Sequence, residues 1–442
     1  MTLTPSQMRA RVLGLAWPVI AENILETMLG IVDTALVARL GPVATAGVGS
    51  ALQVMFFLIS ALSALSIGSS VLVAQAVGAH DMRRASQYAN QSIVWSVLIS
   101  IPVALAGYFL ASPVLGLFQL EPNVHTVATE YLQVTMATII VMIVLFIGRG
   151  VLRGAGDTRT PMIVTGIANV VNAGLAYGLI YGHWGLPALG AVGSAWATFA
   201  ARALAAVLLL IVLWRGSRGI SLRGNSWQPS RPVARQMMGI GLPASLEQVL
   251  SSAAFFVLTL VVARLGTTIL AAQQIAFTAL STSFLPGIGF SIAATTLVGQ
   301  SVGARHIADG AAAARISLTW AVIWMSTAGA LLLIFAKPVI AIFTQDQAVI
   351  EAGADGLRVI AFMQPLWAIG MVLSGALRGT SDTRFPMVVG SSGMWLSVGL
   401  AALLANQGAH NLGLIWAAFI VVAPFTSLLY WRRLKRRFRD LV

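Results

Sequence analysis

The sequence contains no cysteine and very little charge. Without a thiol, the chain can form neither a disulfide framework nor a thiolate metal site. Charged residues make up only 9% of the 442 positions, whereas a soluble domain carries about 25%. So little charge cannot cover a surface that faces water, and 58% of the residues are hydrophobic. Lipid is therefore the expected solvent for most of the protein surface.

Histidine is scarce as well, and motifs for ATP-driven or catalytic chemistry are missing. The five His residues, at positions 80, 125, 183, 306 and 410, lie in predicted loops at scattered spacings, so we expect no metal site. No nucleophile–base pair, P-loop or dinucleotide fingerprint occurs. We therefore expect neither an enzyme nor a cofactor, and an ion gradient rather than ATP as the energy source.

Acidic residues are outnumbered by basic ones, 14 to 27, which gives a net charge of +13. The basic residues gather in short loops rather than on one patch, so a nucleic-acid partner is not expected. If both termini are cytoplasmic, most Lys and Arg residues fall inside and only Arg39, Arg264 and Lys337 fall in outer loops. The distribution predicts a multi-pass protein of an inner (plasma) membrane with both termini in the cytoplasm.

Apolar runs of about 20 residues or more predict twelve transmembrane spans, each helical because an open strand would leave backbone groups unpaired in lipid. The spans are 12–38, 46–76, 88–111, 127–151, 161–182 and 189–214, then 236–263, 271–300, 312–335, 352–377, 386–406 and 411–431. A cytoplasmic linker at 215–235 separates an N-terminal lobe at 1–214 from a C-terminal lobe at 236–442, which ends in a basic cytoplasmic tail.

The two halves repeat each other at a constant offset of 225 residues. The run Ala-Arg-Leu-Gly at 38–41 recurs at 263–266, and Leu-Arg-Gly-x-x-Asp-Thr-Arg at 152–159 recurs at 377–384. The sequence therefore predicts an all-α integral membrane fold of two six-helix lobes related by pseudo-twofold symmetry. In transporters with such parallel repeats, the substrate path lies between the halves, and access alternates by rocking.

The repeated loop is expected to be structural. Gly154 and Gly379 are predicted to end helices, and Thr160 is predicted to cap the next helix, with Pro161 at its first position.

Four acids lie well inside predicted spans: Glu22, Glu26, Asp33 and Glu247. Acids at this depth are functional candidates, because an Asp at the bilayer centre costs about 2.5–3.5 kcal/mol on insertion scales. Spacings of 4 and 7 place the first three on one helical stripe. That stripe must face a cavity or another helix, where its carboxylates can share protons.

Repeat symmetry assigns different roles to these acids. Glu22 aligns with Glu247, which favours a shared structural role as much as substrate or proton binding. Asp33 aligns with Leu258, and a lone acid that breaks the symmetry is hard to explain by packing. We predict that Asp33 couples transport to the cation, with a structurally paired acid as the alternative. Glu26 is intermediate between the two cases.

Several short motifs occur in a fixed order along the chain. They are Trp17-Pro18, Val32-Asp33-Thr34 with Arg39-Leu40-Gly41, Val77-Gly78, the two Leu-Arg-Gly-x-x-Asp-Thr loops, and Leu242-Pro243. In this order and spacing they resemble the multidrug and toxic compound extrusion (MATE) family from about Leu13 to Trp431. The bacterial DinF-like and NorM-like members are the most similar.

The resemblance implies a polar network around the first-span Asp, which here is Asp33. The other positions are a Tyr in the fourth span, an Asn in the fifth and a hydroxyl residue in the sixth: Tyr131, Asn172, and Ser194 or Thr198. Many relatives carry a second Asp one turn after that Asn, where this chain has Ala176. This departure makes a Na⁺ site of two carboxylates doubtful and favours proton coupling.

The resemblance implies a secondary active antiporter that exports small hydrophobic or cationic organic compounds, drugs among them, against H⁺ or Na⁺ entry. Its other partner would be the lipid bilayer, and we expect a monomer. The transport cavity is expected to contain acids and few bases, with Arg202 as the exception, which favours cationic substrates. The alternative is a lipid or lipid-linked saccharide flippase. Its phosphate-bearing cargo calls for a basic cavity and extra spans, and neither is apparent.

Overall fold

The structure, a computed structural model, describes residues 4–408 and 411–441. Within these ranges the chain is almost entirely helical, and the one β-bridge joins Ser217 to Ile220. Ten helices are long and apolar enough to cross a membrane, and there are up to twelve spans if each of two bent helix pairs counts as one. This confirms the predicted all-α membrane fold.

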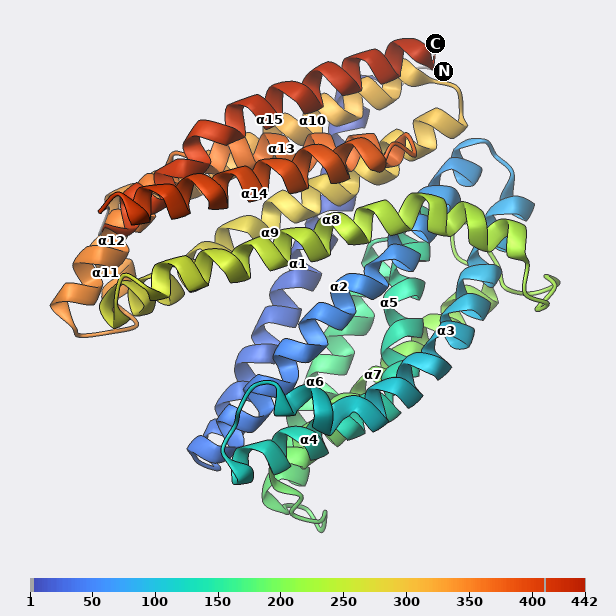
Figure 1. Cartoon of the computed structure of the whole chain (residues 1–442). Helices are drawn as coiled ribbons and strands as arrows, with labels where there is room; N and C mark the ends of the chain where they lie inside the picture. The colour runs from blue at the N-terminus through green and yellow to red at the C-terminus, as the bar shows by residue number, and fades with distance from the viewer. Residues whose placement is uncertain (1–3, 409–410, 442) are drawn as a thin grey trace. The chain divides into compact units, whose positions relative to one another are not determined.

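The helices of the first half are α1 (Pro5–Ala38), α2 (Pro42–Gly78), α3 (Met82–Gly116), α4 (Pro122–Ala137), α5 (Ile139–Gly154), α6 (Arg159–Tyr181) and α7 (Gly190–Arg215). Those of the second half are α8 (Arg231–Ala263), α9 (Thr267–Gly303), α10 (Ile307–Ile334), α11 (Ala336–Ala341), α12 (Gln347–Ala361), α13 (Gln364–Gly379), α14 (Arg384–Asn406) and α15 (Leu412–Asp440) (Figure 1). A shift of 225 positions carries both ends of α2, α5 and α6 onto the ends of α9, α13 and α14. The sequence repeat is therefore a repeat of helices.

Two predicted spans are broken. The sequence predicted single helices at 127–151 and 352–377, but α4 meets α5 at a bend of 56°, and α12 meets α13 at a bend of 52°. At the first break Thr138 has φ −103° and ψ 5°, and its hydroxyl donates to the Val134 carbonyl at 2.8 Å. At the second break Pro365 lies in the first turn of α13, where it has no N–H to donate to the preceding helix. Hydropathy does not register either bend, because each helix pair together is long and apolar enough to read as one span.

Contacts divide the described chain into two compact units. The first-half unit comprises Ala21–Val77 and Asp81–Leu242, and the second-half unit comprises the segment up to Ile20, Gly78–His80 and the chain from Pro243 onward. The core of the first-half unit thus includes Met237 from the start of α8. The core of the second-half unit includes Val12 from the start of α1. The predicted domain boundaries at 1–214, 215–235 and 236–442 follow the sequence repeat, and as folding boundaries they stay a prediction.

Helices α2 and α5 approach closely at a pair of glycines in the first-half unit. A Cβ on Gly150 would lie 2.5 Å from the Ser66 hydroxyl, and one on Gly154 would lie 2.4 Å from the Ser70 carbonyl oxygen. The Ser66 hydroxyl donates to the Phe146 carbonyl of α5 at 3.1 Å. Small residues four apart are a common way for membrane helices to pack, because the backbones can approach each other without intervening side chains.

The second-half unit repeats this contact between α9 and α13. A Cβ on Gly375 would lie 2.5 Å from the Ser291 carbonyl oxygen, and one on Gly379 would lie 2.6 Å from the Thr295 carbonyl oxygen. Ser291 donates to the Met371 carbonyl at 2.7 Å. The same packing therefore stabilises both repeats.

The sequence predicted a structural role for the loop that follows each of these glycine helices. Helices α5 and α13 end at Gly154 and Gly379, which confirms that part of the prediction. The predicted cap on Thr160 is wrong, because α6 already begins at Arg159. Instead, the Asp157 carboxylate accepts from the Thr160 backbone N–H at 3.0 Å, as an acid can just before a helix.

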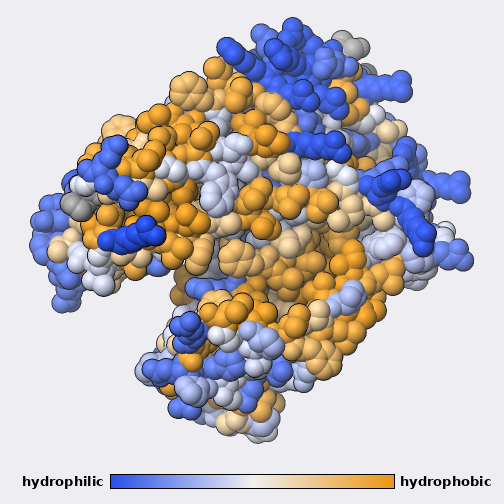
Figure 2. All heavy atoms as spheres, viewed as in Figure 1, coloured by the Kyte–Doolittle hydropathy of each residue, from blue (hydrophilic) through white to orange (hydrophobic). Residues whose placement is uncertain are grey.

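The surface agrees with lipid as the main solvent. On the face drawn in Figure 2, apolar side chains cover the flanks of the long helices, and hydrophilic side chains gather at helix ends, including the end of α15 that carries Arg437 and Arg439. Large apolar side chains lie exposed along the helices, as in Phe109 at 72% and Leu396 at 62%. Such exposure would favour aggregation in water but not in a bilayer.

We expect Gly154→Ala to lower the thermal unfolding midpoint of the detergent-purified protein. The added methyl group meets a backbone carbonyl, which cannot turn aside, and overpacking of this kind costs about 1–3 kcal/mol. Gly174→Ala on α6 is the matched control, because its Cβ would meet no atom within 4 Å. Equal midpoints for the two variants would contradict the close approach of α2 and α5.

Candidate functional site

The first-half unit contains a cavity of about 320 Å³, lined by helices α1, α2, α4, α5, α6 and α7. All six residues predicted for cation coupling line it: Glu26, Asp33, Tyr131, Asn172, Ser194 and Thr198. Glu22 and Glu247 are not among its lining residues. The structure therefore brings together, from four helices, residues that lie far apart in the sequence.

A short hydrogen-bond chain runs across this cavity to Asp33. The Asn172 amide nitrogen donates to the Thr198 hydroxyl at 3.1 Å, and that hydroxyl donates to Asp33 Oδ2 at 3.4 Å, which is long for a hydrogen bond. The other carboxylate oxygen, Oδ1, is buried and has no hydrogen-bond partner among the described residues. Asp33 is therefore held weakly, with one oxygen available to a cation or to water.

One face of α7 supplies three polar side chains to the cavity. Ser194, Thr198 and Arg202 are each one helical turn apart, so they point the same way, and all three line the cavity. Ser194 is 1% exposed, and its hydroxyl lies close to Tyr131. Both predicted alternatives for the sixth-span hydroxyl are thus present, and Thr198 is the one that reaches Asp33.

Glu22 is fully buried and bound by two arginines from α5. Its Oε2 accepts from Arg153 at 2.7 Å, and its Oε1 lies 3.4 Å from Arg149 Nε. The second-half unit contains the matching pair, in which Arg378 donates to Glu247 at 2.9 Å. An ion pair at the same place in both repeats supports a structural role for the two acids, because breaking a buried pair costs several kcal/mol, about 3–5.

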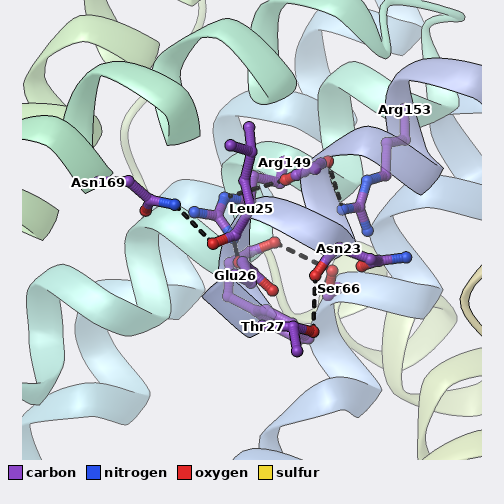
Figure 3. Close-up of polar contacts among 10 residues, drawn as sticks. Asn23, Leu25, Glu26, Thr27, Ser66, Arg149, Arg153 and Asn169 are labelled. Carbon is purple, nitrogen blue, oxygen red and sulfur yellow. Dashed lines mark hydrogen bonds and ion pairs between the residues drawn. The ribbon is translucent and has the colours of Figure 1, made fainter. Parts of the chain in front are cut away.

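Arg149 also pairs with Glu26. Figure 3 shows Arg149, Arg153 and Asn169 reaching α1 around Glu26, and Asn169 donates to the Leu25 carbonyl at 2.6 Å. The stripe of acids on α1 is therefore not a set of free carboxylates that share protons, as the sequence suggested. Among the described residues, Asp33 is the acid of this stripe that has no ion pair.

Arg149 lies within a predicted span, but its pairing with Glu26 was not predicted. A comparison of the two repeats indicates this pairing. Glu26 aligns with Ser251 and Arg149 aligns with Ser374, so the acid and the base are replaced together in the second half. Residues that change as a charge-balanced pair between repeats are expected to touch, and Glu26 and Arg149 do.

The second-half unit has a cavity of about 230 Å³ with a different lining. It is aromatic, with Phe277, Trp367 and Trp416 among its walls, and its polar lining residues include Gln273 and Thr259. No acid or base lines it. In the described ranges, no group of three or more His, Asp and Glu side chains could hold a metal ion.

We expect Arg149→Ser to lower the thermal unfolding midpoint, since it leaves Glu26 without its partner. Adding Glu26→Ser should restore part of the loss, because the double variant has the residues of the second repeat and Glu22 keeps Arg153. A double-mutant cycle should show a coupling free energy of about 0.5–3 kcal/mol. Strictly additive effects of the two changes would show that the pair has no energetic coupling.

Comparison with known proteins places these features in a family. The MatE family model matches residues 18–178 and again residues 243–403. Over 426 residues the chain is 30% identical to the probable multidrug resistance protein NorM of Thermotoga maritima, which covers 96% of this chain and 91% of that protein. Over 427 residues it is 30% identical to the multidrug resistance protein NorM of Burkholderia vietnamiensis, with 95% and 92% covered.

Solved structures agree on the fold. An outward-facing multidrug resistance MATE family transporter of the MOP superfamily superposes with a TM-score of 0.91 at 22% identity, covering 100% of this chain and 99% of the other. A MOP superfamily transporter from Pyrococcus furiosus, described as having a binding pocket of reverse polarity, gives a TM-score of 0.90 at 21% identity over 100% and 99%. At these identities the likeness establishes the fold alone. The family model matched once in each half, together with 30% identity across nearly the whole chain, shows that this multi-pass membrane protein belongs to the MatE, or multidrug and toxic compound extrusion, family.

Proposed function

We propose that the protein is a secondary active antiporter of the bacterial inner membrane that exports small hydrophobic or cationic organic compounds while H⁺ or Na⁺ enters. The multidrug resistance proteins to which it is similar support this function. The observation that carries the coupling is the state of Asp33, which lines a cavity with a free carboxylate oxygen and has no ion pair within the described ranges. The protein would act as a monomer, without catalysis and without a bound cofactor.

Asp33 would couple transport by binding and releasing a proton or Na⁺ at its carboxylate. A proton or Na⁺ on the carboxylate favours one conformation of the transporter, and the exported compound favours another. Coupling follows because the two ligands bind the two conformations with different affinities. With both termini in the cytoplasm, as the basic loops favour, Asp33 lies toward the outer end of α1, where a cation enters from outside.

Proton coupling is favoured over Na⁺ coupling by the oxygen atoms near Asp33. The cavity offers hydroxyl and amide oxygens from Thr198, Asn172, Tyr131 and Ser194, but the position one turn after Asn172 is the buried Ala176 and adds no second carboxylate. A hard cation is best bound by several oxygen ligands, carboxylates among them, whereas a proton needs only one. A site whose one unpaired carboxylate is Asp33 therefore suits H⁺ better.

A flippase for phosphate-bearing lipids is less well supported. The cavity is lined by two acids, Glu26 and Asp33, as well as by Arg149 and Arg202, so acids equal bases in number and the lining is not the predominantly basic one that a phosphate needs. In the part of the chain that the structure describes, the ten to twelve candidate spans include none beyond those of two six-helix lobes.

We expect Asp33→Asn to abolish gradient-driven export of a cationic dye from proteoliposomes, because the amide cannot take up or release a proton at physiological pH. The measurement is dye efflux under an imposed pH gradient and, separately, under an imposed Na⁺ gradient. Export driven by the pH gradient alone would identify H⁺ as the coupling ion.

The matched control is Glu351→Gln, which neutralises an exposed acid on α12 and should export normally. Size-exclusion profiles of both variants should match the wild type. Undiminished gradient-driven export by a folded Asp33→Asn protein would rule out Asp33 as the coupling residue.

A further inference from the structure

The last helix, α15, continues beyond its apolar part. Residues 412–431 contain no charged side chain and are about 30 Å long, which matches the hydrocarbon core of a bilayer. Trp431, the last of them, is 49% exposed, and aromatic residues gather in this way at the membrane interface. The remaining turns of the helix, from Arg432 to Asp440, therefore lie at the depth of the lipid head groups.

One face of these turns is anchored to the second-half unit. Leu434 is buried in the hydrophobic core of this unit. The Arg433 guanidinium pairs with Asp382 at 2.7 Å, and Arg437 donates to the Thr380 carbonyl at 3.4 Å. Two cations of the helix end are therefore bound within the protein, and together with the core contact they hold these turns in a fixed orientation.

The opposite face carries four exposed cations, and none of them forms an ion pair with a described residue. We call these residues the basic stripe: Arg432, Lys435, Arg436 and Arg439. Their spacings of 3, 4 and 7 positions place them on one side of the helix, which turns once in 3.6 residues. Figure 2 shows hydrophilic side chains gathered at this end of α15. The four positive charges therefore point together, away from the protein core.

Neighbouring side chains add positive charge to this end of the second-half unit. Met8, at the start of α1, belongs to the same hydrophobic core as Leu434, and Figure 1 draws these two helix ends together. Arg9 and Arg11 on that part of α1 are exposed as well. Asp440 is an exposed acid at the end of α15, and it can offset one charge at most. The basic stripe thus keeps an excess of positive charge for a partner outside the protein.

The first repeat shows that the fold does not require these charges. Helix α7 ends at Arg215 and α15 ends at Asp440, 225 positions later, so the two helices can be compared residue by residue. The positions of α7 that match the basic stripe are all apolar: Val207, Leu210, Ile211 and Trp214. Most of them are exposed, as side chains that face lipid are. The same helix surface in the second repeat therefore faces lipid with cations, which are costly there unless water or an anion reaches them.

We propose that the basic stripe binds the head groups of anionic phospholipids and gathers these lipids beside the second-half unit. Clustered cations just beyond a membrane span attract anionic lipids, and arginine can bind two phosphate oxygens at once. The helix is held by its opposite face, so the stripe is in place before any lipid arrives. With both termini in the cytoplasm, the lipids belong to the cytoplasmic leaflet. The proposal does not depend on what the protein exports.

The absence of cysteine from the sequence makes a direct measurement possible. Asp440→Cys introduces a single thiol at the end of the basic stripe, and this thiol can carry a fluorescent donor. In proteoliposomes, energy transfer to phosphatidylglycerol with a labelled acyl chain is compared with transfer to phosphatidylcholine with the same label. We expect the anionic lipid to be enriched about fivefold around the donor, the effect of one cation near the membrane surface. Added salt should lower the enrichment, because it screens the charges.

Two sets of substitutions in this background separate the basic stripe from the net charge of the protein. The first set removes the stripe: Arg432→Gln, Lys435→Gln, Arg436→Gln and Arg439→Gln. We expect it to abolish the enrichment. The matched control removes the same charge from exposed positions of the first-half unit: Arg215→Gln, Arg218→Gln, Arg223→Gln and Arg231→Gln. We expect it to leave the enrichment at α15 unchanged.

Several outcomes would overturn the proposal. Equal transfer to both lipids with the stripe intact would do so, whether or not the substituted proteins fold. Enrichment that survives loss of the stripe, or that the control set abolishes equally, would show that net charge attracts the lipid. Loss of enrichment with inorganic phosphate, but not with chloride at the same ionic strength, would identify free phosphate as the ligand. An intact stripe that shows no lipid preference but binds RNA in phosphatidylcholine nanodiscs would make nucleic acid its partner.

Discussion

A carboxylate at membrane depth must be neutralised by a partner or carry a proton, and this constraint organises the charged interior of the protein. Glu22, Glu26 and Glu247 form ion pairs with arginines from the helix that follows a bend. Asp33 forms no ion pair with any described residue. The difference separates acids that the fold has fixed from one that is free to exchange its proton, and it depends on direct contacts rather than on the number of acids along a helix.

The glycine contacts explain how arginines reach these acids. Helices α5 and α13 lie almost against the backbones of α2 and α9 at Gly150 and Gly375, so little space there is filled by side chains. Arg153 and Arg378, three residues farther along, are held in fixed positions relative to α1 and α8. Close backbone packing and buried ion pairs are therefore parts of one arrangement, and each half of the chain contains it.

Much of this arrangement could be predicted from the sequence. The offset of 225 residues gave the repeat, hydropathy gave the spans, and the unmatched Asp33 pointed to the cavity that the structure contains. The bend at Thr138 was not predictable, since it arises from backbone geometry inside a run that hydropathy reads as one span, whereas Pro365 within the predicted span 352–377 is itself a signal for a kink. The partners of Glu26 were missed for another reason. A single sequence does not show which charged residues of distant helices meet. The repeat did contain a signal, because Glu26 and Arg149 are both replaced by serine in the second half, at Ser251 and Ser374.

The two halves show how a duplicated fold can diverge. Positions that stabilise the bundle, such as Glu22 and Glu247, stay alike, while the cavity of one half holds charges and that of the other is aromatic. Specialisation is thus confined to side chains that the packing does not need.

The double contact of Arg149 restricts how such divergence can proceed. Replacing the Glu26 codon first leaves the guanidinium with a second carboxylate, Glu22, at 3.4 Å. Replacing the Arg149 codon first leaves Glu26 without a direct ion pair among the described residues, and Arg153 and Arg202 act on it only from a distance. The evolutionary path between a Glu–Arg and a Ser–Ser state is therefore directional, and lineages that lose the pair should lose the acid before the base.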